Sequence, residues 1–168
     1  ETGTISASID IDFFTAGTVG GVSNGLGEAF LNSVGFPVSG LIELEGQVVD
    51  QADPVINNPT IVLNNVRINT ASDTAFVSVT NQATGNDQAA VDAAISSASP
   101  VVSSGAFQDL LPGGTNSDTL QVSIETTTAG AISGTATVAF VSAASNIGGC
   151  APNCEINRTS QDVSVSGN

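Results

Sequence analysis

The chain has 168 residues, with 16 acidic and two basic side chains and a net charge of −14. Proteins neutralise nucleic-acid phosphates with Lys and Arg, so this composition excludes nucleic-acid binding, and an anionic membrane surface would repel the chain. No apolar stretch is long enough to cross a bilayer, so we expect no membrane insertion. The charge instead favours divalent cations as partners.

The composition also argues against an enzyme. The sequence contains neither His nor Lys, so no such base is available to activate a serine nucleophile. No pair of acidic residues lies in a context that indicates a dry cleft for acid–base catalysis. The Gly-rich stretch 17–27 lacks the Lys of a phosphate-binding loop, and we interpret it as a long hairpin loop.

Apolar and polar residues alternate along several short segments, which predicts half-buried β-strands with one solvated face. Turn signals such as Asn24-Gly25 and the stretch 111–114 separate these segments. In chain order the alternating segments are residues 9–13, 42–44, 120–124, 136–140 and 163–165, and β-branched residues predict further strands at 60–63 and 74–80.

One segment allows two interpretations. Residues 82–97 include an Ala-rich stretch that favours a helix, with Asn86 or Asp87 as its N-cap. The same residues fit a strand with an Ala-rich face, and the sequence leaves the two alternatives open.

The chain contains an internal repeat. Residues 3–14 resemble residues 130–141, and residues 42–47 resemble residues 163–168. Residues 1–53 are therefore interpreted as a partial repeat that holds the closing strands of one module, and residues 54–168 as a complete module. Such strands must complete their own sandwich, complete a neighbouring copy, or be completed by a repeat upstream, because an isolated apolar hairpin is not stable in water.

The order of several segments suggests a family. Residues 59–68, 75–81, 111–115 and 128–138 together resemble the immunoglobulin-like repeats of bacterial surface proteins called choice-of-anchor D proteins, which are related to Hydin-type modules. The resemblance covers residues 54–168 and implies an immunoglobulin-like sandwich in a long, anchored extracellular protein, with no catalytic residues. The predicted fold is therefore all-β: an immunoglobulin-like antiparallel β-sandwich with additional N-terminal strands from the partial repeat.

The partial repeat is richer in carboxylates than its second copy. Asp10, Asp12, Glu43 and Glu45 lie on the polar faces of two strands that we expect to be neighbours, whereas the positions that correspond to them carry no charge. Like charges opposite one another weaken a sheet, and bound Ca²⁺ or an Arg would relieve the repulsion. The alternative is a solvated acidic face screened by salt. A weaker metal candidate combines Asp50, Asp53 and Asp73.

The two cysteines are Cys150 and Cys154, with three residues between them. Two ligands cannot complete a zinc site in a chain without His, so we expect a local disulfide, with unpaired thiols as the alternative.

These observations predict a non-enzymatic structural module, secreted or at the cell surface. It would associate with identical modules into a homopolymer through the apolar residues of the partial repeat, which are Ile9, Ile11, Phe13, Ile42 and Leu44. The alternative is an adhesin domain that binds a ligand through loops 17–27 and 146–154. The absence of Tyr and Trp disfavours glycan binding by such loops.

Overall fold

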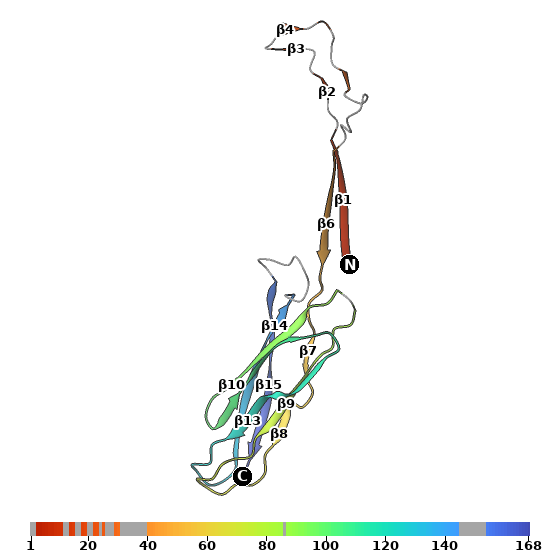
Figure 1. Cartoon of the computed structure of the whole chain (residues 1–168). Helices are drawn as coiled ribbons and strands as arrows, with labels where there is room; N and C mark the ends of the chain where they lie inside the picture. Colours follow the sequence, from red (N-terminus) through yellow and green to blue (C-terminus); the bar gives the residue numbers. More distant parts are fainter. Residues whose placement is uncertain are drawn as a thin grey trace. The chain divides into compact units, whose positions relative to one another are not determined.

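The computed structural model describes residues 3–11, 14–15, 18–19, 22–23, 25, 29–30, 40–85, 87–144 and 154–168. The chain forms two units, Glu1–Val48 and Val49–Asn168 (Figure 1). All regular secondary structure among the described residues is β-strand, which confirms the all-β prediction. The described part of the chain accordingly contains no helix that could span a membrane.

The first unit is built on one long antiparallel pair. Strands β1 (Gly3–Ile11) and β6 (Gly40–Val48) have nine residues each and pair along their full length. Between them in the chain, β2 (Phe14–Thr15) pairs with β5 (Ala29–Phe30), and β3 (Thr18–Val19) pairs with β4 (Val22–Ser23). We call the β1–β6 pair the ribbon.

The second unit is a sandwich of two sheets. The five-stranded sheet has the order β12-β10-β14-β15-β8, and the four-stranded sheet has the order β11-β13-β9-β7. Every pairing is antiparallel except that of β15 with β8. In chain order the strands are β7 (Pro54–Ile56), β8 (Thr60–Val62), β9 (Ala75–Asn81), β10 (Ala90–Ser97), β11 (Val101–Ser104), β12 (Ala106–Leu110), β13 (Thr115–Ile124), β14 (Ile132–Ala143) and β15 (Glu155–Gly167).

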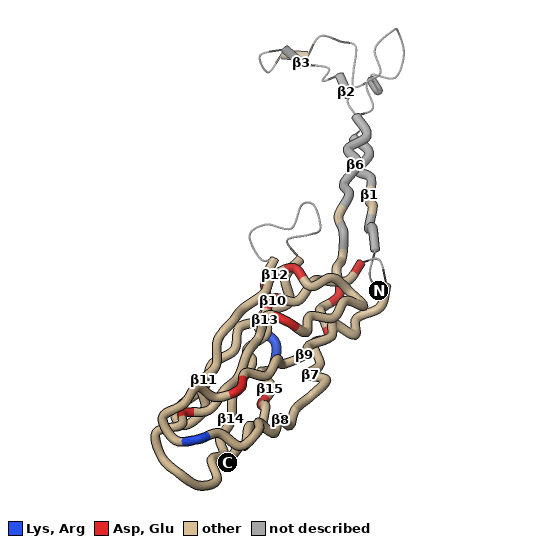
Figure 2. The backbone as a smooth tube through the Cα atoms, turned by 60° about the horizontal axis from the view of Figure 1, so that its bottom comes forward, with Lys and Arg blue, Asp and Glu red and all other residues tan. Residues whose placement is uncertain are grey.

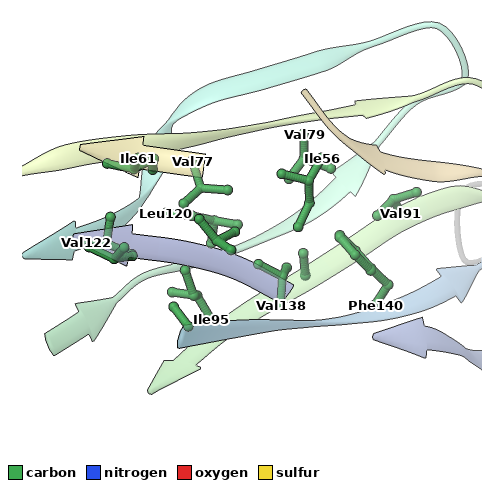
Figure 3. Packing of buried hydrophobic residues seen from close by; sticks show 14 of the residues in the cluster. Ile56, Ile61, Val77, Val79, Val91, Ile95, Leu120, Val122, Val138 and Phe140 are labelled. Atoms are coloured by element: carbon green, nitrogen blue, oxygen red, sulfur yellow. The ribbon is translucent and has the colours of Figure 1, made fainter. Parts of the chain in front are cut away.

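Alternate residues of both sheets meet in one hydrophobic core (Figure 3). Val77 and Leu120 from the four-stranded sheet and Val138 from the five-stranded sheet are fully buried. Their neighbours along each strand face the opposite way, as period-two alternation requires. This packing confirms the predicted immunoglobulin-like sandwich.

The chain passes from one sheet to the other at every connection from β7 to β14. At two of these crossings, which we call strand switches, an edge strand of one sheet continues into an edge strand of the other. One leads from β7 in the four-stranded sheet to β8 in the five-stranded sheet, and the other leads from β11 to β12. The second switch occurs at Gly105, whose φ of +114° is one that side-chain-bearing residues rarely adopt. A Cβ at this position would lie 2.1 Å from the carbonyl oxygen of Thr119, so only glycine fits.

The side-chain amides of Asn58 and Gln161 stabilise the first switch by hydrogen bonds to the backbone. Asn58 donates to the carbonyl of Phe76 and accepts from the N–H of Ser78, at 2.9 and 2.8 Å. Gln161 on β15 donates to the carbonyl of Pro54 and accepts from the N–H of Ile56, at 2.7 and 3.1 Å. Each amide bonds a carbonyl and an N–H two residues apart and so replaces a missing strand neighbour.

Buried polar side chains attach residues 49–53 to the sandwich. Asn81 is fully buried and accepts from the N–H of Asp53 at 3.1 Å, and Ser142 accepts from the N–H of Ala52 at 2.9 Å. Ala52 itself is fully buried in the core. The sandwich therefore begins several residues before β7.

The strands expected at 60–63, 74–80, 120–124, 136–140 and 163–165 all occur, some of them longer than expected. Of the two alternatives for residues 82–97, the strand is correct, because residues 90–97 form β10. Its Val91, Ala93 and Ile95 are buried and Ala94 is exposed, as alternation in a strand requires. Ala93, which also favoured a helix, therefore occupies a position where the sheet packs closely.

Candidate association surface

The register of the ribbon separates apolar from polar positions. Ile9 lies opposite Ile42, and Ala7 lies opposite Leu44. Opposite residues of an antiparallel pair share a face, so the ribbon has one apolar side. The positions on this apolar face are Gly3, Ile5, Ala7, Ile9 and Ile11 on β1 and Gly40, Ile42, Leu44, Gly46 and Val48 on β6.

The ribbon has the same register as a hairpin of the sandwich. Under the sequence repeat, β1 corresponds to β14 and β6 corresponds to β15, and these two strands also pair antiparallel. Every pair of opposite residues that can be compared between the two hairpins matches. The pairs Ile5–Gly46, Ala7–Leu44, Ile9–Ile42 and Ile11–Gly40 correspond to Ile132–Gly167, Gly134–Val165, Ala136–Val163 and Val138–Gln161.

The two copies differ in what surrounds them. In the sandwich, Ala136, Val138 and Val163 are fully buried against the opposite sheet. Strand β14 has β10 on its other side, and β15 has β8. The ribbon forms a sheet of only two strands in the described part of its unit. The described part of the first unit therefore has the pairing of the β14–β15 hairpin without the strands that flank that hairpin in the sandwich; that it is a partial repeat stays a prediction.

Among the described positions on the apolar face, Gly46 and two positions that carry side chains, Ala7 and Val48, are open to solvent. Ala7, at the centre of β1, is exposed, and Val48 is 39% exposed at the end of β6. A two-stranded ribbon is at best marginally stable in water, and an apolar face adds to that problem. Neither residue was in the predicted association set. The alternation that identified Ile9 and Ile11 continues back to Ala7, and the alternation that identified Ile42 and Leu44 continues forward to Val48, so the same pattern could have identified both residues.

The residues predicted for strand association are partly placed. Ile9, Ile11, Ile42 and Leu44 occupy the apolar face by register. Phe13 lies outside the described residues. The two strands are neighbours, as expected, but their role in association stays a prediction.

The predicted calcium ligands are distributed along the polar face of the ribbon. Asp10 lies opposite Leu41, Glu43 lies opposite Ser8 and Glu45 lies opposite Ser6, so no two of these three carboxylates are opposite each other. The expected direct repulsion across the pair is therefore wrong for them. Asp12 lies outside the described residues, and Ca²⁺ binding by this set stays a prediction.

The three residues of the weaker metal candidate, Asp50, Asp53 and Asp73, do not come together in one site. Asp50 accepts from the N–H of Gln51, and Asp73 accepts from the amide of Asn64 at 2.6 Å. Within the described residues, no group of three or more acidic or Cys side chains gathers to hold a metal ion. Figure 2 shows the acidic residues of the sandwich spread over it. Asp53 therefore does not form one site with the other two.

The remaining predicted features fall largely outside the described residues. Cys154 is partly buried and its predicted partner Cys150 is not described, so the disulfide stays a prediction. Loop 146–154 is described only at Cys154. In loop 17–27 only the β3–β4 pair and Gly25 are described.

Comparisons with known proteins identify no family. No family model matches the sequence, and no curated protein matches it. Among solved structures, the ASH or PapD-like domain 7 of human CEP192 is similar to 70% of this chain and 85% of that chain, with a TM-score of 0.47 and 12% identical residues. The immunoglobulin-like assignment follows from the sheet order of the sandwich itself.

Proposed function

We propose that this chain is a non-enzymatic extracellular structural module that associates with identical modules by β-strand addition, in a cell-surface fibre, stalk or matrix. The single observation that carries the proposal is the shared register of β1–β6 and β14–β15. The same hairpin is completed in the sandwich and lacks its neighbouring strands in the described part of the first unit. The resemblance to choice-of-anchor D repeats supports a location at the cell surface.

The length of the strand edges favours the ribbon as the site of addition. The outermost strands of the sandwich are short: three residues in β7 and β8, four in β11 and five in β12. Each of them also continues through a switch into the other sheet, which limits access to its edge. The ribbon strands have nine residues each and offer a longer run of backbone groups to a partner.

The energies are of the right size for reversible assembly. Burying one Ile or Leu side chain contributes about 1.5–3 kcal/mol, so covering Ile5, Ile9, Ile42 and Leu44 would contribute about 6–12 kcal/mol. The loss of translational and rotational freedom on association costs about 4–15 kcal/mol. The net charge of −14 also opposes association of identical chains. We therefore expect assembly that depends on concentration and becomes stronger as salt screens the charge.

Sedimentation velocity of the intact chain tests the proposal. The unmodified chain should form dimers or larger species as its concentration rises, and Ile9→Asp should remain monomeric because a charge is then placed on the apolar face. Gln47→Asp adds the same charge to the polar face, opposite Thr4, and should still assemble. Ile9→Val should also assemble, because it keeps the face apolar. A monomeric unmodified chain at every concentration and salt level would refute strand association.

The adhesin alternative rests on loops that lie mostly outside the described residues. It predicts a monomer that binds a defined ligand, so the same sedimentation experiment separates the two functions.

A further inference from the structure

We infer that the partner of the ribbon is the ribbon of a second copy, joined to it through antiparallel pairing of β1 with β1. This inference rests on the proposed function and names its partner, edge and register. The contact would make one four-stranded sheet from two chains, in the order β6-β1-β1-β6.

The charges of the two strands select the edge. Strand β6 carries Glu43 and Glu45 near its centre, so pairing β6 with a second β6 would bring carboxylates of the two chains close together. Strand β1 carries a single acidic residue, Asp10, near one end. Like charges on paired strands are destabilising, and a chain with a net charge of −14 has few Arg side chains to offset them. The β1 edge is therefore the more favourable edge for an identical partner.

The repeat supports an antiparallel partner at this edge. Strand β14, which corresponds to β1, has an antiparallel neighbour, β10, along eight residue pairs that begin at Ala136. Strand β15, which corresponds to β6, has a parallel neighbour, β8, along only three. Only residues 136–138 of the stretch that β10 pairs with correspond to residues of β1, which are Ile9–Ile11, and residues 164–166, which pair with β8, correspond to 43–45 of β6. The two edges therefore have counterparts of equal length, and the repeat distinguishes them by orientation: the partner at the β1 edge is antiparallel, as a two-fold contact between copies requires.

The alternation of β1 selects the register. Opposite residues share a face, so apolar positions meet only if the paired residue numbers are both odd. The register with the greatest overlap of Gly3–Ile11 places Ala7 opposite Ala7 of the second copy. It also places Ile5 opposite Ile9 and Asp10 opposite Thr4, so no carboxylate of β1 faces another. The apolar faces of both ribbons then form one continuous surface. This edge contact extends that surface without covering it, so the burial energy of the isoleucines and Leu44 would come from a further contact across the joined face.

This contact has a specific consequence for assembly. A two-fold contact uses the same edge on both chains and closes after two copies. The basic unit is therefore a dimer, and a fibre grows from it only through a further contact, such as the outer edges of β6 or the joined apolar face.

Disulfide cross-linking of the intact chain tests the edge. In a Cys150→Ser, Cys154→Ser background that is first shown to associate like the unmodified chain, Ala7→Cys should give covalent dimers on oxidation. Leu44→Cys is the matched control, because it is central in β6, lies opposite Ala7 and shares its face. It should give at least tenfold less dimer. A mixture of Ser6→Cys and Ser8→Cys chains should form a mixed dimer more readily than either chain alone, since Ser6 meets Ser8 in this register.

Each outcome decides between the claims. Preferential cross-linking of Leu44→Cys would overturn the choice of edge. Equal cross-linking of both variants, or none in a chain that still associates, would place the contact elsewhere and overturn this inference while leaving the proposed function intact. Stronger self-cross-linking of Ser6→Cys than of the mixture would overturn the register. A chain that does not associate at all would overturn the proposed function as well.

Discussion

Replacement of Asn81 by Leu removes a buried polar centre of the sandwich while nearly keeping the size of the side chain. Asn81 is fully buried and its side chain makes four hydrogen bonds. It accepts from the N–H groups of Asp53 and Ala83, at 3.1 and 3.3 Å, and it donates to the carbonyls of Ala89 and Leu110, at 3.1 and 3.2 Å. These four residues flank four different strands, so one amide holds together the segments at one end of the sandwich.

The expected cost follows from these bonds. A typical intramolecular hydrogen bond contributes about 0.5–1.5 kcal/mol net, and leaving a buried partner unsatisfied costs about 1–3 kcal/mol. The greater apolarity of Leu offsets part of this loss, about 1.5 kcal/mol. We therefore expect Asn81→Leu to lower the free energy of unfolding by about 3 kcal/mol, a large part of the total stability of a domain of this size.

The assay is urea unfolding followed by far-ultraviolet circular dichroism, because the chain has no Trp or Tyr for fluorescence. The transition midpoint should fall with an unchanged slope. Asn65→Leu is the control at an exposed Asn and should change stability by less than about 0.5 kcal/mol. A loss below about 1 kcal/mol for Asn81→Leu would mean that the four hydrogen bonds of this amide contribute almost nothing to stability, contrary to the expectation.

Three further predictions concern the switches and the polar face. Gly105→Ala should destabilise the sandwich by about 3 kcal/mol or more in the same urea assay, because its Cβ would strike the Thr119 carbonyl, and a loss below 1 kcal/mol would contradict the switch geometry. Gln161→Leu should cost about 2 kcal/mol by removing both bonds to β7, whereas Gln108→Leu at an exposed position should be near neutral. If the ribbon carboxylates hold Ca²⁺, calorimetric titration should show heat of binding that Glu43→Gln reduces; no heat in the unmodified chain would exclude the site.

Local sequence patterns were sufficient for the long strands. Alternation located β13, β14 and β15 because part of each strand buries every second residue, at 120–124, 136–140 and 163–165, and each strand extends beyond the segment that identified it. The internal repeat also indicated which strands are neighbours, and the common register of β1–β6 and β14–β15 agrees with it. Repeated sequence predicts repeated pairing because the same apolar positions must reach the same face.

The strand switches could not be predicted in the same way. Strands β7, β11 and β12 have three to five residues and were not predicted, and β8, with three residues, was located by its β-branched residues but not as part of a switch. Their positions depend on Gly105 and on the amides of Asn58 and Gln161, whose partners are distant in sequence. The Ala-rich composition of β10 gave an ambiguous signal because small residues suit both a helix and a close-packed sheet.

Hydrogen exchange of the β1 backbone at increasing protein concentration tests the central claim most directly. Amide groups within Gly3–Ile11 that do not pair with β6 should exchange more slowly as concentration rises, while exchange in β14 stays constant because its neighbours belong to the same chain. Exchange rates in β1 that are independent of concentration, up to the highest accessible value and in high salt, would contradict the claim that a second chain completes the ribbon.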